Sequence, residues 1–290
     1  MTTPYILPAQ LVTMPTGVQW TTIPSSGATK EAQLAAQLEL CRTASRWADS
    51  FCEMPLFATE DVEEMTAPGP RAAPDNNGVL WLTPLRKPVI NVVSIETRPS
   101  VSYATDYTAV NSTYVTTLAN AGQSELASGA GTYRLRVIGS GIVKGMTWQS
   151  WSVRLTYVNG WANSELASAV TSGGTSLSVL DGTGYSVGDS VEIADATLTE
   201  TVSISAVNGT TLTVSALVNS HAAGVQVTNL PSNIRTAAGW YAAHIALSRG
   251  SSAMAIPIAG ARRSRPAGSG GDTFYLDLAT QLLQPYRRVW

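Results

Sequence analysis

Apolar residues recur at helical spacing in the segment that follows residue 28. Two neighbouring stripes run along it, one formed by Leu34, Leu38, Cys41, Ala48 and Cys52 and the other by Leu40, Ala44, Trp47 and Phe51. Stripes that lie side by side are typical of a helix that is covered on more than one side. The pattern predicts a helix from Thr29 to about Cys52, which Pro55 ends.

Helical spacing returns twice near the C-terminus. Pro231 is suited to the first turn of a helix, and apolar positions carry this second pattern to Gly250. Residues 262–272 are rich in Gly and Arg and predict a flexible basic linker. A short terminal helix, Phe274–Leu283, is expected after the linker.

Strand-like runs lie between the first two helices. The pattern predicts four of them: Val79–Leu82, Val89–Thr97, Tyr133–Ile138 and Trp151–Val158. In the last run Val153, Leu155 and Tyr157 share one face with Trp151, while polar residues alternate with them. We therefore expect this strand to have one buried face.

Residues 163–228 differ in character from the rest of the chain. No Lys or Arg occurs between Arg154 and Arg235, and six carboxylates give the segment a strong negative charge. Five short strands separated by glycine turns are predicted: Ser176–Leu180, Ser190–Ala194, Thr201–Ala206, Thr211–Ser215 and Val225–Thr228. Asn208-Gly209 is a strong hairpin signal between two of them. The segment is expected to be an acidic all-β module, either a solvated stabilising insert or a surface that docks partners or repels DNA.

The N-terminal residues 1–28 are rich in Pro, Thr and Ser, with scattered apolar anchors. They predict an extended arm that packs on something larger. The expected fold is therefore α+β, a small helical bundle with a β-strand region and an inserted all-β module. Its parts are the arm (1–28), a core formed by 29–162 and 229–290, and the insert (163–228).

Composition favours a subunit of an assembly. Charged residues make up only 13% of the chain, and the basic ones are 15 Arg and 3 Lys. Arg suits forked and partly desolvated contacts, whereas Lys mainly solubilises an exposed surface. The net charge of −2 gives no sign of a basic field for nucleic acid.

Membrane insertion, secretion and disulfide bonding are not expected. No apolar stretch reaches the roughly 18 residues of a membrane span, and Pro4, Pro8 and Pro15 interrupt the N-terminus before any apolar run. Cys41 and Cys52 fall on one predicted helix, about 16 Å apart, which is too far for a disulfide. We expect both cysteines to be buried and free.

One pattern suggests a catalyst. Gly184–Gly188 matches the G-x-S-x-G of a nucleophile elbow around Ser186, and Asp195 and His221 follow in the order of a serine hydrolase. That chemistry needs a helix after the serine, whereas the residues after Gly188 predict a strand. We therefore expect a β-turn here, no enzyme and no cofactor. Two histidines and two distant cysteines also predict no metal site.

Partner contacts are expected at both ends of the chain. Aromatic residues with Arg are favoured anchors of protein interfaces. The predicted C-terminal partner-binding residues are Phe274, Tyr286, Arg287, Arg288 and Trp290. Tyr5 and Trp20 are further candidate contacts on the N-terminal arm.

The chain resembles the head–tail connector (adaptor) proteins of tailed phages. The resemblance covers about residues 29–162 and 229–290 and depends on the stretches Leu85–Ile95, Tyr157–Trp161 and Pro231–Ala238. The last two normally follow one another within a few residues in that family, so the module at 163–228 is expected to be an insertion between them.

The resemblance implies a structural virion protein at the portal vertex, in the neck, assembled in the host cytoplasm. Subunits of the family form a ring beneath the portal, for which twelve copies are expected, and extend the DNA channel. The implied partners are the portal protein, neighbouring subunits, the next neck or tail protein (a stopper or tail terminator) and, non-specifically, the passing genome. Family members hold the portal largely through C-terminal segments.

A different class of function stays open from the sequence. A surface- or carbohydrate-binding β protein would use the acidic module as its binding part, and exposed aromatics within 163–228 would support it. Tyr185 is the one aromatic residue in that segment. A serine hydrolase centred on Ser186 is the least favoured alternative.

Overall fold

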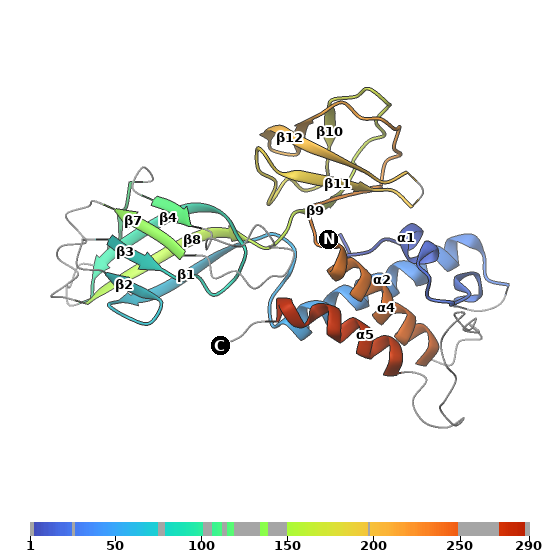
Figure 1. Cartoon of the computed structure of the whole chain (residues 1–290), viewed down its shortest axis with the longest axis horizontal. Helices are drawn as coiled ribbons and strands as arrows, with labels where there is room; N and C mark the ends of the chain where they lie inside the picture. The colour runs from blue at the N-terminus through green and yellow to red at the C-terminus, as the bar shows by residue number, and fades with distance from the viewer. Residues whose placement is uncertain are drawn as a thin grey trace. The chain divides into compact units, whose positions relative to one another are not determined.

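The chain forms two compact units (Figure 1). One unit is made of Met1–Leu56 and Ala162–Trp290, and the other is Phe57–Trp161. The structure is a computed structural model, and it describes residues 3–24, 27–74, 79–100, 106–111, 115–118, 134–138, 150–196, 198–248 and 273–287. This division differs from the predicted one, which joined the strand region to the helices and set apart the arm at 1–28 and the insert at 163–228.

Three long helices of the first unit lie where the sequence predicts them. They are α2 (Lys30–Cys52), α4 (Ser232–Ser248) and α5 (Thr273–Leu283). The Thr29 hydroxyl caps α2 by accepting a hydrogen bond from the Ala32 N–H at 3.3 Å. The helix ends at Glu53, which adopts the left-handed conformation at φ 58°. The predicted linker at 262–272 lies outside the described residues.

Small side chains let α4 pack closely against its neighbours. Its buried positions include five alanines and one glycine: Ala237, Ala238, Gly239, Ala242, Ala243 and Ala246. On α2 the buried positions follow the two predicted stripes in part, because Leu40, Cys41 and Ala44 are buried while Leu34 is 47% exposed. Both cysteines are buried and free, as predicted, and burial raises the pKa of each thiol to about 12.

The N-terminal segment is not a simple extended arm. It contains a short helix, α1 (Pro8–Thr13), and a single 3-10 turn, η1 (Trp20–Thr22). Most of its large apolar side chains, among them Leu11 and Val18, are buried within this chain, while Val12 is 47% exposed. Part of the segment is helical because Pro8 stands at the first helical position and the Gln10 side chain accepts from the Leu7 N–H.

Residues 163–228, the β-module, form a curled antiparallel sheet of six strands. Its strands are β9 (Asn163–Glu165), β10 (Ser176–Ser178), β11 (Ser190–Ala194), β12 (Glu200–Asn208), β13 (Thr211–Val214) and β14 (Gln226–Thr228), in the order β10-β13-β12-β11-β14-β9. The two end strands also meet, through the Leu166–Val179 bridge and the bond from the Leu180 N–H to the Glu165 carbonyl at 2.9 Å. The sheet therefore closes on itself around its own core.

The ends of the β-module lie beside each other. β9 and β14 are paired, with Asn163 opposite Thr228. The Asn229 N–H donates to the Ala162 carbonyl at 3.1 Å just outside this pair. The chain thus enters and leaves the module at neighbouring points. This is the geometry expected of an insertion.

The second unit, Phe57–Trp161, is built from two sheets. One sheet has the order β1-β8-β4-β5 and the other β2-β3-β7-β6. The bounds are β1 (Thr59–Ala67), β2 (Ala72–Pro74), β3 (Val79–Leu82), β4 (Val89–Pro99), β5 (Thr108–Ala109), β6 (Val115–Leu118), β7 (Arg134–Ile138) and β8 (Trp151–Asn159). Buried side chains from both sheets, such as Leu80, Ile95 and Leu155, form one core between them. The predicted buried face of β8 is confirmed.

Strand β1 was not predicted, because it carries four acidic residues. Two of them point outward, while Asp61 and Glu63 face inward and find partners there. Asp61 pairs with Arg86 at 2.5 Å, and Glu63 pairs with Arg71 at 2.6 Å and accepts a hydrogen bond from the Tyr157 hydroxyl. Ion pairing thus allows acidic side chains at positions where the sequence pattern would require apolar ones.

Candidate partner-binding site

The C-terminal helix packs on its own chain. In α5 the buried residues Ala279 and Leu283 face the other helices, and Tyr275 stacks on Trp240 of α4 with ring centroids 5.5 Å apart. The Tyr275 hydroxyl donates to the Thr16 carbonyl at 2.8 Å. The α5 helix is therefore part of the helical layer and does not project from it.

Two of the predicted partner-binding residues are open to solvent. Phe274, at the start of α5, is 50% exposed. Arg287 is exposed and lies beside α2, where its guanidinium is 3.4 Å from Glu53 and 5.7 Å from the centre of the Phe51 ring. A contact of this kind is weak in water. Arg287 can therefore exchange its contact with Glu53 for a contact with a partner at a small cost in free energy.

The other predicted residues lie elsewhere. Tyr286, Tyr5 and Trp20 are only 1%, 1% and 3% exposed. Their rings fill the interior of this chain, which corrects their assignment as surface anchors. Arg288 and Trp290 fall outside the described residues.

The structure brings together aromatic residues that the sequence analysis did not single out as a group. Trp47 of α2 stacks on Tyr241 of α4, with centroids 3.9 Å apart and planes within 6°. Phe51 continues the stack on one side and His244 on the other, with centroid distances of 5.6 and 5.7 Å. Together with Trp240, Tyr275 and Phe274, these residues form what we call the aromatic belt.

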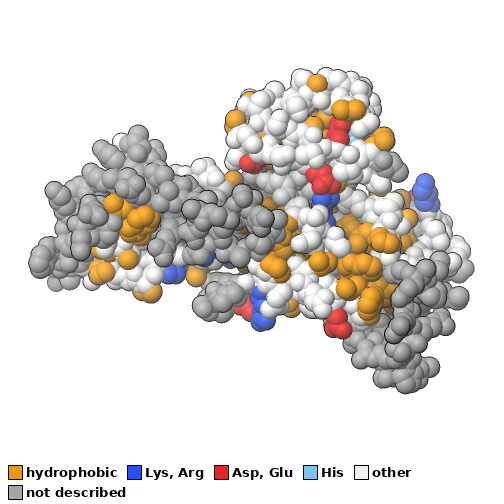
Figure 2. Space-filling view, in the orientation of Figure 1, with side chains coloured by type: hydrophobic (Ala, Val, Ile, Leu, Met, Phe, Trp, Pro, Cys, Tyr) orange, Lys and Arg blue, Asp and Glu red, His pale blue; other side chains and the backbone are white. Residues whose placement is uncertain are grey.

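The aromatic belt is accessible from solvent in part. Trp47, Phe51, Trp240, Tyr241 and His244 are all partly exposed. Figure 2 shows hydrophobic side chains gathered over the helical part of this unit. The spacing of Trp47 and Phe51, four residues apart on one helix, was the available sequence signal. The pairing with α4 could not be foreseen, because it depends on tertiary packing.

The carboxylates of the β-module are largely used within the protein. Glu192 forms a two-pronged ion pair with Arg235 of α4. Glu200 lies 3.0 Å from one ring nitrogen of the buried His221, and Asp195 lies 3.5 Å from the other. The side chains of Asp181 and Asp189 accept backbone N–H bonds in turns. This arrangement favours a structural role for the acidic residues over a bare negative surface.

Glu200 illustrates how hydrogen bonds within the module stabilise an ionised carboxylate. Burial raises the pKa of this carboxyl, but hydrogen bonds from His221 and from the Val218 and Asn219 N–H groups outweigh it. The net effect holds the pKa of Glu200 below its usual range. The carboxylate thus stays ionised and ties the start of β12 to the segment that contains Val218, Asn219 and His221.

Ser186 lies in a turn, as predicted. The Asp189 N–H donates to the Ser186 carbonyl at 3.1 Å, and strand β11 begins directly afterwards. Both nitrogens of His221 face carboxylates. The described geometry therefore offers Ser186 no helix N-terminus and no histidine base.

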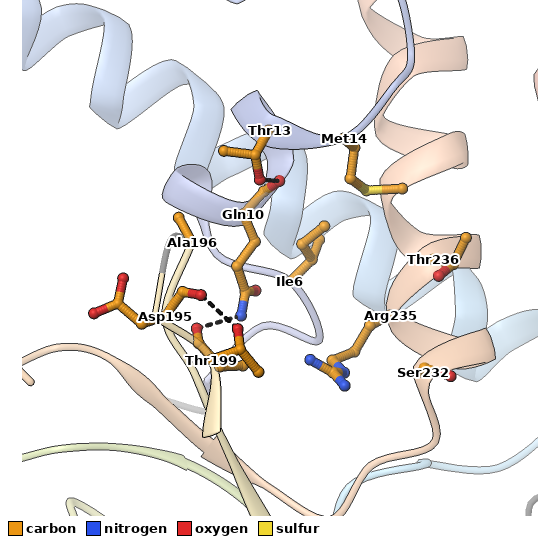
Figure 3. A pocket seen from close by; sticks show the side chains of 11 residues that line it. Ile6, Gln10, Thr13, Met14, Asp195, Ala196, Thr199, Ser232, Arg235 and Thr236 are labelled. Carbon is orange, nitrogen blue, oxygen red and sulfur yellow. Dashed lines mark hydrogen bonds between the residues drawn. The ribbon is translucent and has the colours of Figure 1, made fainter. Parts of the chain in front are cut away.

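A cavity of about 240 Å³ lies within the first unit (Figure 3). It is lined by Ile6, Gln10, Thr13, Met14, Ala194, Asp195, Ala196, Thr199, Ser232, Arg235 and Thr236. The Gln10 amide donates to the Ala194 carbonyl at 2.7 Å, and Arg235 is paired with Glu192. Because these groups already have partners, the cavity marks a junction between three segments and not a reactive site.

Within the described ranges, no three His, Cys, Asp or Glu side chains are grouped so that they could hold a metal ion. No helix in the same part of the chain is both long and apolar enough to cross a membrane.

Comparisons with protein-family models, with curated proteins and with solved structures found no match to this chain.

Proposed function

We propose that this protein is a structural adaptor of a tailed-phage neck, which forms a ring under the portal and docks the next neck or tail protein. The observation that carries the proposal is the meeting of the module ends. Asn229 hydrogen-bonds to Ala162, so the β8 segment and α4 would follow one another directly without the module. This restores the order of elements on which the family resemblance depends.

The partner surface of the adaptor is proposed to be the aromatic belt, which includes Phe274, together with Arg287 beside it. Large aromatic side chains with an Arg at the edge are typical of the best anchors in protein interfaces. Phe274 and Arg287 lie at the two ends of the described C-terminal segment. This surface therefore replaces the earlier set that included Tyr5, Trp20 and Tyr286.

Subunits of a ring need two different complementary surfaces, because each contacts one neighbour on either side. Negative-stain electron microscopy of the purified full-length protein tests this requirement directly. Rings with a central hole are expected, with twelve subunits as the proposed number. A protein that stays monomeric at micromolar concentration, alone and with its portal, would contradict the proposal.

The carbohydrate-binding alternative gains no support from the module. Its aromatic residue, Tyr185, is 6% exposed, and its hydroxyl donates to the Val227 carbonyl at 2.7 Å. Sugar rings are usually held by stacking on exposed aromatic faces, which Tyr185 does not offer. We therefore put forward the adaptor alone.

A further inference from the structure

The N-terminal segment touches the β-module through side-chain amides. The Asn163 amide donates to the carbonyls of Thr3 and Pro4, at 3.0 and 3.2 Å. The Gln226 amide donates to the carbonyls of Pro4 and Tyr5, at 3.3 and 3.2 Å. In the opposite direction Gln10 donates to the module at Ala194 (Figure 3).

The same segment is fastened to the helices. The Tyr5 N–H donates to the Ser45 hydroxyl of α2 at 2.9 Å, and the Tyr5 hydroxyl donates to Asp49. Further along, Met14 packs so closely on α4 that a Cβ at Gly239 would collide with its sulfur. Residues 3–14 therefore contact the module on one side and both helices on the other.

The hydrogen bonds between the segment and the module join side-chain amides to carbonyls, whereas the module has its own apolar core. The core of the module is formed by its own residues together with Ala162: Leu166, Leu177, Val179, Tyr185, Val191, Ile193, Val202, Ile204, Leu212, Val214, Leu217 and Val227. Amide-to-carbonyl bonds can be exchanged for bonds to water at a small net cost. Separating the segment from the module would thus leave the module core intact.

We propose that Thr3–Met14 is a releasable strap, which fixes the β-module on the helical layer and whose detachment lets the module move as a separate body. Apart from the strap, the described residues join the module to the helical layer at the chain junction of Ala162 and Asn229 and through the Glu192–Arg235 pair. A single ion pair and a two-strand junction leave rotation about the junction open. The strap therefore sets the direction in which the module faces.

The test uses the full-length protein and a variant that loses the module side of the strap, Gln10→Ala with Asn163→Ala and Gln226→Met. Methionine preserves the volume of the buried Gln226 while it removes the amide donors. The measurement is nitrogen-15 transverse relaxation of module amides compared with α2 and α4 amides. The two sets are expected to relax alike in the native protein, and the module rates to fall roughly twofold in the variant because a freed domain tumbles faster.

The matched control is Gln33→Ala. Gln33 makes the same kind of amide bond, to the Thr21 carbonyl at 2.7 Å, but between the N-terminal segment and α2 only. Its module and helix rates are expected to stay equal. If the triple variant does not fold, Tyr5→Phe serves instead, because it keeps the ring and removes the hydroxyl that donates to Asp49 and accepts from the Leu56 N–H at 3.0 Å. Equal relaxation of module and helices in a folded strap variant, or the same change in the control, would overturn the proposal.

Discussion

Asp49 is a carboxylic acid inside the helical layer, near the end of α2. It accepts hydrogen bonds from the Tyr5 hydroxyl and from the Leu56 N–H, the latter at 3.0 Å. Burial raises the pKa of Asp49 to about 6, although these two bonds lower it in part. The residue thus holds a proton at mildly acid pH that it would release in the unfolded chain.

This gives a pH dependence with a definite sign. Between pH of about 4 and about 6 the folded state binds more protons than the unfolded state, so the free energy of unfolding falls as pH rises. The total loss of unfolding free energy is about 3 kcal/mol, at ~1.4 kcal/mol for each of the roughly two pKa units. Asp49→Asn should remove this component, so the stability difference between the native protein and the variant should change with pH by that amount. Urea unfolding at a series of pH values measures it.

The control for this prediction is Asp277→Asn, which changes an exposed carboxylate on α5. Its stability difference from the native protein should stay nearly constant over the same range. A constant difference for Asp49→Asn as well would show that this carboxyl is ionised normally in the folded protein.

Gly182 is required where the closed sheet of the module is tightest. A Cβ at this position would collide with the main-chain carbonyl of Gly209, in the β12–β13 hairpin. Because backbone cannot move aside as a side chain can, Gly182→Ala should cost about 1–3 kcal/mol. Gly224→Ala is the comparison, since its Cβ meets nothing within 4 Å and only the φ of +81° opposes it. Thermal unfolding should show the smaller loss for Gly224→Ala.

Residue types alone did not reveal which aromatics are buried. The sequence analysis marked Tyr286 as an anchor because it stands beside arginines near the C-terminus, and Tyr5 and Trp20 because they are aromatic residues of the predicted arm. In the fold, the Tyr5 hydroxyl donates a hydrogen bond to Asp49, and the Trp20 carbonyl accepts one from the Gln37 amide at 3.1 Å. These partners come from distant parts of the chain, so no local pattern could indicate them.

At the scale of elements, periodicity located most of the structure. The helix α2, the strand β8 and the Asn208-Gly209 hairpin were predicted because apolar spacing and turn chemistry act locally. Strand β9 was missed because Asn163–Glu165 is short and polar. It is a strand because its backbone pairs with β14, 61 or more residues later in sequence.

The paired ends of the β-module make its removal testable. Replacement of Asn163–Thr228 by a short Gly/Ser linker should leave a chain that unfolds cooperatively, since the linker must span only the gap between adjacent strands. A modest loss of stability is expected because the strap loses its module contacts. Circular dichroism at 222 nm, followed during heating, should retain the helical signal and a single transition. A broad and gradual loss of signal would show that the module is integral to the helical layer.

At the scale of the whole molecule, a substitution of Arg287 should affect partner binding without a large effect on the free energy of unfolding. Its ion pair with Glu53 is between half-exposed side chains, so Arg287→Ala should change stability by less than ~1 kcal/mol. Under the proposed function it should weaken capture of the protein by heads that carry the portal. Arg46→Ala is the control, because Arg46 pairs with Glu39 on the same helix and is 75% exposed. Equal capture of both variants in a sedimentation assay would place the contact elsewhere.

The arrangement of the first unit has a consequence for synthesis on the ribosome. Phe57–Trp161 is a continuous stretch and can fold as soon as it emerges, whereas the unit around it is closed by both ends of the chain. The hydrogen bond from the Gln226 amide to the Tyr5 carbonyl cannot form until Gln226, 221 residues later, has been synthesised. At roughly 5–20 residues per second that delay is about 10–45 s. During this interval the carbonyls of Pro4 and Tyr5 lack their Gln226 partner, so the N-terminal segment of a nascent chain can pack on α2 but stays unattached to the module until Gln226 has emerged.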